Sequence, residues 1–224
     1  MTKNSRLVHL IGPTGVGKNL IGKLLQDDQR FSYMLTVYSL GDTIHERLGN
    51  PCFAGKFADL VRKGELLPDE EVCTLYEKTF SSDGKPVAVN NGFFRTTGQI
   101  SWGADHGLLE TTSTTVVFDA VKSTCWVRAI AKAKNKPAAR HIREDEFDRA
   151  FKRHQKSLDL LVRSLMKTGT RVVRINADRP IVTEVFLDVA AHVKVAFDKG
   201  DAHKHAASIH CQPSIPATAY AARL

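Results

Sequence analysis

Long apolar segments are missing from this chain of 224 residues. Its hydrophobic runs are far shorter than the roughly 20 residues that a helix needs to span a bilayer. The first six residues also lack the apolar core of a secretory signal. We therefore expect no membrane partner and a cytoplasmic location.

Cysteine is scarce as well. The four cysteines are scattered and show no Cys-x-x-Cys spacing; they are Cys52, Cys73, Cys125 and Cys211. Free thiols in a reducing compartment are the simplest account of this pattern. With 42% hydrophobic and 25% charged residues, the composition is that of an ordinary globular protein. A chain of this length can bury one sizeable core.

Acidic residues are outnumbered, because 32 Lys and Arg face 24 Asp and Glu, for a net charge of +8. Such an excess suggests nucleic acid or an acidic membrane surface as a partner. However, the basic residues cluster between Arg128 and Arg153 with few aromatic residues among them, and no RNA-binding motif occurs. This favours a local site for polyphosphate, with solvated surface charge as a further alternative. We expect no nucleic-acid partner.

A glycine-rich stretch, Gly12 to Asn19, follows an apolar run and precedes residues with helical spacing. Strand, glycine turn, lysine and helix form the pattern of a phosphate-binding P-loop. The glycines allow several backbone N–H groups to point into one concavity, and Lys18 can reach the outer phosphates. Asn19 stands where a hydroxyl would normally hold Mg2+. The alternative is a glycine turn with an incidental lysine.

Strand-like and helix-like segments alternate along the chain. We expect strands at residues 7–11, 33–38, 86–90, 114–120 and 171–175, and later helices at about 52–63, 68–79, 145–167 and 182–197, with another through Trp126 and Ile130. We also expect Asp42 to cap a helix and Pro68 to be a first helical residue. Alternation predicts a parallel sheet covered on both faces, with ligands at the carboxyl ends of its strands.

Five stretches together resemble the adenylate kinase family of nucleoside monophosphate kinases, in its short-lid form, over residues 6 to about 197. They are Gly12–Lys18, Leu40-Gly41-Asp42, Gly64–Asp69, Asn91–Thr96 followed by Gln99, and the basic segment from Arg128 to Arg143. The resemblance implies an α/β fold of the P-loop NTPase type with a parallel five-stranded sheet.

The resemblance also implies how the chain is divided. The core would comprise residues 1–39, 85–127 and 154–199, interrupted by a helical insert that binds the monophosphate at about 40–84 and a short lid at about 128–153. Residues 200–224 contain several His, Ala and Pro and one Cys, and we expect a flexible tail there. Metal binding by this tract is the alternative. We expect a monomer.

The resemblance implies that ATP, with Mg2+, donates a phosphoryl group to a nucleoside monophosphate. The implied donor positions are Gly12, Gly15, Val16, Gly17, Lys18, Asn19, Arg128 and Lys132. The implied acceptor positions are Gly41, Asp42, His45, Leu67, Gly92, Arg95 and Gln99. The implied catalytic residues are Lys18, Arg95, Arg143 and Arg153, with Arg140 as a substitute for one of the last two. Each arginine has the alternative of being a surface or ion-pair residue.

The chain departs from the family at positions that face the metal and the acceptor. Asn19 replaces the P-loop hydroxyl, Asn91 replaces a strand-end Asp, Leu40 replaces a Thr, and His45 replaces an Arg. Phe94 for Pro is a milder change. Neutral amides hold Mg2+ less firmly than carboxylates. Two main hypotheses remain open: a nucleoside monophosphate kinase, whose acceptor need not be AMP, or a nucleotide-binding protein without turnover. A third is a P-loop kinase for a non-nucleotide acceptor.

Overall fold

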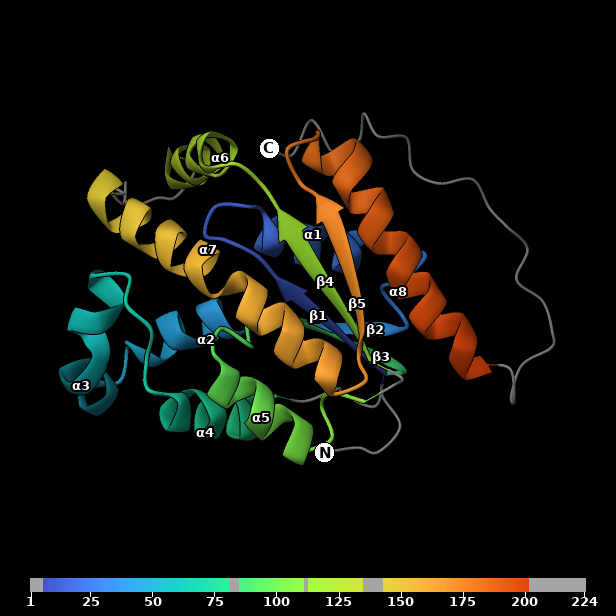
Figure 1. Ribbon diagram of the computed structural model, residues 1–224, viewed down its shortest axis with the longest axis horizontal. Helices are drawn as coiled ribbons and strands as arrows, with labels where there is room; N and C mark the ends of the chain where they lie inside the picture. Colours follow the sequence, from blue (N-terminus) through green and yellow to red (C-terminus); the bar gives the residue numbers. More distant parts are fainter. Residues whose placement is uncertain (1–5, 81–84, 111–112, 135–142, 202–224) are drawn as a thin grey trace.

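The computed structural model describes residues 6–80, 85–110, 113–134 and 143–201 (Figure 1). A sheet of five parallel strands lies at its centre, in the order β2-β3-β1-β4-β5. The strands are β1 (Arg6–Ile11), β2 (Leu35–Ser39), β3 (Val87–Asn91), β4 (Thr114–Asp119) and β5 (Arg171–Asn176). This confirms the predicted α/β fold and all five strands, with small shifts in their bounds.

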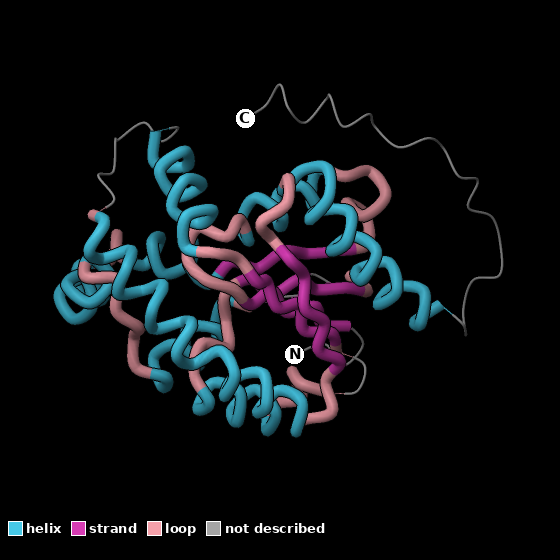
Figure 2. Tube along the Cα trace, turned by 45° about the horizontal axis from the view of Figure 1, so that its top comes forward, coloured by secondary structure: helices cyan, strands magenta, loops and turns pink. Residues whose placement is uncertain are grey.

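Helices cover both faces of the sheet (Figure 2). They are α1 (Lys18–Asp27), α2 (Leu40–Arg47), α3 (Pro51–Arg62), α4 (Asp69–Thr79), α5 (Thr97–Asp105), α6 (Lys122–Lys134), α7 (Glu144–Lys167) and α8 (Phe186–Asp201), the last preceded by a π-helical turn, Ile181–Val185. Helices α1 and α8 pack on one face of the sheet, and α4, α5 and the C-terminal half of α7 pack on the other. Alternating side chains of each strand supply the two apolar cores.

The long helix α7 contributes to both cores. Its apolar residues Phe147, Phe151, Leu161 and Leu165 are each at most 4% exposed, and Leu158 is partly buried. Phe147 and Phe151 belong to one core, whereas Leu161 and Leu165 belong to the other. Helix α7 therefore crosses the end of the sheet, as Figure 1 shows, and closes one side of the space above the carboxyl ends of the strands.

Several local predictions are corrected by the structure. Ser39 is the N-cap of α2, because its Oγ accepts a hydrogen bond from the Asp42 backbone N–H, so Asp42 does not cap that helix. Pro68 is the N-cap of α4 and precedes its first helical residue. Helix α5 was not predicted, and α8 begins four residues later than expected because the π-helical turn precedes it.

Two of the connections between strands contain more than one helix. Helices α2, α3 and α4 join β2 to β3, and α6 and α7 join β4 to β5.

Arg140, Cys211 and nearly all of the expected tail lie outside the described residues. Cys52, Cys73 and Cys125 carry free thiols. Within the described ranges, no helix is both long enough and apolar enough to cross a membrane.

Candidate functional site

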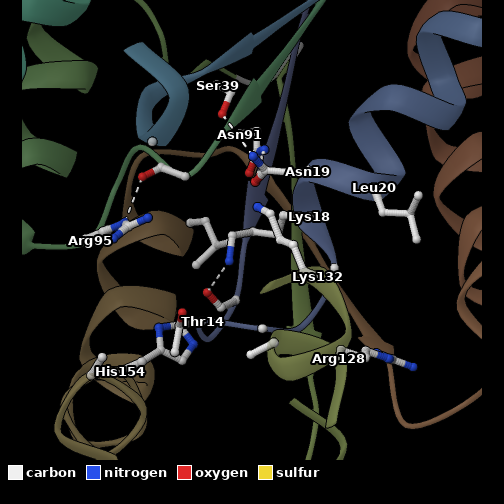
Figure 3. Close-up of a pocket in the computed structure, with 18 of the residues that line it drawn as sticks. Thr14, Lys18, Asn19, Leu20, Ser39, Asn91, Arg95, Arg128, Lys132 and His154 are labelled. Carbon is white, nitrogen blue, oxygen red and sulfur yellow. Dashed lines mark hydrogen bonds between the residues drawn. The ribbon is translucent and has the colours of Figure 1, made fainter. Parts of the chain in front are cut away.

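A cleft of about 730 Å³ opens at the carboxyl ends of β1 and β3. It is lined by the glycine-rich loop and α1, by the segment that follows β3, by α6, and by α7 (Figure 3). This is the position that a parallel sheet with crossover helices provides for a ligand. The sequence predicted a site at this edge of the sheet.

The glycine-rich loop has a shape that only glycine allows at two positions. Gly15 and Gly17 have φ angles of +79° and +110°, in a region that side chains disfavour. A Cβ atom at Gly15 would lie 2.2 Å from the backbone oxygen of Cys125 in α6. At Gly17 it would lie 1.9 Å from Cδ1 of Ile181, which belongs to the π-helical turn. The loop is therefore tightly enclosed by two other elements.

Lys18 begins α1 and turns its side chain back into this loop. Its Nζ atom donates hydrogen bonds to the carbonyl oxygens of Gly12, at 2.7 Å, and Pro13, at 2.9 Å. Burial, reinforced by the nearby charges of Arg95 and Lys132, lowers the pKa of the Lys18 ammonium from 10.5 to about 7. A bound polyanion would reverse the repulsion among these cations, so the loop is electrostatically prepared for phosphate.

Four further predicted cations line the same cleft: Arg95, Arg128, Lys132 and Arg153. The Nε atom of Arg95 donates to the Gly92 carbonyl at 2.9 Å, and Arg153 Nη1 donates to the Gly64 carbonyl at 2.8 Å. Burial, and then the charge of Arg153, lowers the pKa of Arg95. Guanidinium groups nevertheless stay charged at neutral pH. The structure thus places these predicted residues around one space.

Arg128 lies on the side of the cleft nearest the glycine-rich loop. One of its amino groups donates to the Val16 carbonyl at 3.0 Å, and the other donates to the Arg179 carbonyl at 2.8 Å. Arg143, in contrast, does not line the cleft. It is an exposed residue that forms an ion pair with Asp145 at 3.1 Å just before α7.

The two asparagines at the predicted metal-facing positions bind each other. Asn91 Nδ2 donates to Asn19 Oδ1 at 3.1 Å (Figure 3). Asn19 Nδ2 in turn donates to Asp42 Oδ2 at 3.0 Å. Ser39 Oγ lies 3.5 Å from the same Asn19 nitrogen. Among the described residues, no three or more His, Cys, Asp or Glu side chains gather as a metal site. A chain of amide hydrogen bonds therefore joins α1, α2 and β3.

The predicted acceptor positions divide into two sets. Gly41 and Gly92 line the cleft together with Arg95. Leu67, in contrast, is a core residue that is 6% exposed, and His45 lies exposed on α2 away from the cleft lining. The placement of Gln99 as a ligand of the acceptor base stays a prediction.

Gln99 is buried beneath the cleft, where both ends of its amide have protein partners. Its Oε1 accepts from the Arg95 backbone N–H at 2.8 Å, and its Nε2 donates to Asp69 Oδ1 at 2.9 Å. Asp69 also accepts from Thr96 Oγ1 at 2.8 Å. The Gln99 side chain therefore positions the backbone of Arg95, and the Asp69 carboxylate positions the Gln99 side chain.

Sequence reasoning missed two residues of this site. Asp69 was recognised only as part of a motif. In the structure it lies at the start of α4 and accepts hydrogen bonds from Thr96 and Gln99 at the N-terminus of α5. His154 was not singled out, yet it lines the cleft next in sequence to Arg153. Its position next to Arg153 was the one sequence feature that could have pointed to His154. That feature is weak, because a single histidine on a helix is usually a packing residue.

No protein-family model matches the chain. Two curated proteins are similar to it, however. An adenylate kinase from Prochlorococcus marinus is 37% identical over 92 residues, which are 41% of this chain and 47% of that protein. An adenylate kinase from Elusimicrobium minutum is 34% identical over 94 residues, which are 42% of each. The chain thus matches less than half the length of these relatives. These matches support a relationship to the adenylate kinase family.

Proposed function

We propose that this protein is a nucleoside monophosphate kinase that transfers the γ-phosphoryl group of ATP to AMP or another nucleoside monophosphate. The observation that carries this proposal is the convergence of Lys18, Arg95 and Arg153 on one cleft from three separate elements. The relationship to curated proteins named adenylate kinase supports it.

The proposed reaction asks for positioning and positive charge more than for covalent chemistry. The N–H groups of residues 15–18 and the Lys18 ammonium would bind the donor's phosphates. Arg128 and Lys132, which line the cleft from α6, would face the donor. Arg95 would bind the α-phosphate of the acceptor. Arg153, near enough to lower the pKa of Arg95, would share the charge of the group in transfer. Planar guanidinium groups suit this task because each can donate two parallel hydrogen bonds to phosphate.

The residues present fit a nucleotide-bound Mg2+ only weakly. Asn19 Oδ1 and Asp42 Oδ2 are oxygen atoms of the kind that this hard cation prefers, but they already accept hydrogen bonds from the amides of Asn91 and Asn19. Only Asp42 brings a negative charge, so these residues would hold the hydrated ion mainly through the nucleotide. When bound, Mg2+ neutralises phosphate charge in such reactions.

The direct test is turnover. Purified protein is mixed with Mg-ATP and each nucleoside monophosphate in turn, and nucleoside diphosphates are measured. We expect diphosphate from at least one acceptor, and at least a hundredfold less from Lys18→Ala. Lys167→Ala, at the exposed last turn of α7, should match the parent. Absence of diphosphate with every acceptor would end the proposal.

The Asn19–Asn91 hydrogen bond favours a second candidate, a nucleotide-binding protein without turnover. In that case the substitutions Asn19→Thr and Asn91→Asp, made together, should create or strongly raise turnover by restoring a hydroxyl and a carboxylate. A parent protein that already turns over at an ordinary enzyme rate of about 10 per second would contradict this candidate.

A further inference from the structure

His154 lies on α7 with its imidazole directed toward the glycine-rich loop (Figure 3). The residue lines the cleft, yet its Nε2 atom is shielded from solvent and has no hydrogen-bond partner among the described residues. Buried polar atoms in proteins are nearly always hydrogen-bonded, so an exception calls for a reason. Because protein atoms cover Nε2, a ligand in the cleft supplies the missing partner only when the His154 side chain turns toward it.

The charged groups around His154 come from several elements. Lys18 of α1 and Arg95 after β3 act on it from the cleft, and Asp119 at the end of β4 acts with the opposite sign. Lys132 of α6 and Arg153 of α7 line the same cleft. Burial, followed by Lys18 and Arg95, lowers the pKa of His154 from 6.5 to about 4, so its ring is neutral at physiological pH.

A polyphosphate reverses these conditions. It brings several negative charges into contact with the same cations, and its oxygens accept hydrogen bonds. An imidazolium next to phosphate is stabilised by both effects, whereas a neutral ring can donate only if its tautomer places the proton on Nε2. The empty cleft therefore disfavours a proton on His154, and the occupied cleft favours it.

We propose that His154 is a proton-gated ligand of the polyphosphate. When the nucleotide binds, the His154 side chain turns into the cleft, takes one proton from solvent and donates its Nε2–H to a phosphate oxygen. The inference rests on the proposed function, since it assumes that the cleft takes a nucleoside polyphosphate. It assigns to His154 a direct contact with substrate, and it predicts that acid tightens binding.

The test uses P1,P5-di(adenosine) pentaphosphate, whose internal phosphates are fully ionised near neutral pH and so release no proton on binding. Calorimetric titrations at pH 6 in buffers of different ionisation enthalpy give the number of protons taken up. We expect the parent to take up about one proton more than His154→Gln at pH 6. Lys18, with its pKa of about 7, also takes up a proton when the ligand binds near pH 8, and it does so in both proteins. The difference between them should therefore vanish at pH 8.

Affinity gives a second readout. The parent should bind roughly tenfold more tightly than His154→Gln at pH 6, measured relative to their ratio at pH 8. A fixed charge in His154→Arg should remove most of this pH dependence. His192→Gln is the matched control, because His192 lies on α8 outside the cleft lining and also has a lowered pKa. It should behave as the parent does.

Each outcome decides between the two proposals. Binding at both pH values without a difference in proton uptake between the parent and His154→Gln would overturn the role of His154 and leave the kinase proposal standing. Failure of the ligand to bind at either pH would overturn both. If His154→Gln does not fold, the His154 ring is titrated by NMR in the parent. Its pKa should move from about 4 to above the ordinary 6.5 when ligand is added, and an unmoved pKa would overturn the inference.

Discussion

Two walls of the cleft are built in different ways. The P-loop wall, residues 12–18, owes its shape to backbone conformation, with Gly15 and Gly17 in left-handed geometry and Lys18 bound to backbone carbonyls. The α4–α5 wall, by which we mean residues 91–96 together with α4 and α5, which support them from outside the cleft lining, is held by side chains. Asp69, Thr96 and Gln99 form its central hydrogen bonds.

This difference between the walls explains which residues of the chain depart from the adenylate kinase pattern. A backbone cradle tolerates little change, and its glycines and lysine are kept. A side-chain network can be rebuilt with other polar groups, as the Asn19–Asn91 pair illustrates at the junction of the two walls. We infer that the P-loop wall sets what class of ligand binds, and that the opposite wall sets how the second ligand is held.

The largest expected effect is a loss of kcat/KM, and it should distinguish two of the predicted catalytic arginines. Arg95→Ala removes a guanidinium that lines the cleft, and we expect kcat/KM to fall by about 10²–10³-fold. Arg143→Ala removes an exposed residue paired with Asp145, so we expect a change of less than about threefold, as for surface ion pairs. Steady-state kinetics with the best acceptor measures both. Equal losses would mean that Arg143 reaches the cleft during turnover, which would contradict the distinction between the two arginines.

The second comparison tests the P-loop wall against an unconstrained glycine. In Gly15→Ala the new Cβ would meet the Cys125 oxygen at 2.2 Å, with φ at +79°. We expect the free energy of unfolding to fall by about 2–3 kcal/mol and nucleotide to stop raising the melting temperature. Gly55→Ala, in α3 with nothing within 4 Å of the added atom, should instead stabilise the protein by about 0.5–1 kcal/mol.

Denaturant unfolding and melting with and without ATP measure these effects. If Gly15→Ala binds ATP as the parent does, the P-loop wall does not depend on its left-handed glycine.

The third comparison concerns the α4–α5 wall. Asp69→Asn weakens the acceptor of bonds from Thr96 and Gln99, and we expect a loss of about 1–3 kcal/mol in the free energy of unfolding. Because Gln99 also holds the Arg95 backbone, KM for the acceptor should rise while KM for ATP stays unchanged. The neighbouring exposed Glu70→Gln is the control and should change stability by less than about 0.5 kcal/mol. An equal rise in both KM values would refute the division into two walls.

The same division explains how far sequence reasoning reached. The five strands, the P-loop and the buried side of α7 follow from apolar spacing and glycine placement, which are local signals. Helix α5 was missed because its own residues include Gly98 and Gly103, both poor helix formers. Its start is stabilised from outside, by Asp69 bonded to Thr96 and Gln99.

For the site, too, local sequence features were recognised and the contacts between distant residues were not. Lys18 and Arg95 belong to motifs of the resemblance, and Arg128 and Lys132 belong to its basic segment. Arg153 lies outside these stretches and was implied by the resemblance alone. The resemblance also implied Arg143 as a catalytic residue, whereas in the structure this side chain is exposed and pairs with Asp145, two residues away. His154 was missed because nothing local distinguishes a cleft histidine from a packing histidine.

The smallest expected effect is a pH dependence of the core beneath the α4–α5 wall. His9 is 1% exposed, with Nε2 bonded to the Leu108 carbonyl at 2.9 Å and Nδ1 3.3 Å from the Asn90 amide. Asn90 in turn donates to the Tyr76 hydroxyl of α4. Burial lowers the pKa of His9 from 6.5 to about 4.

Because the unfolded chain takes up this proton near pH 6.5 and the folded protein only near pH 4, stability should decrease as pH falls through that window. From one side chain, the loss between pH 7.5 and 5.5 is about 1 kcal/mol. His154 and His192 have pKa values lowered in the same direction and should add to it. Urea unfolding of the parent and of His9→Gln at both pH values separates the contributions, since the variant should lose less stability by that amount. A parent and variant with the same pH dependence would assign acid sensitivity to the other histidines, and the α4–α5 wall would then rest on a core indifferent to acid.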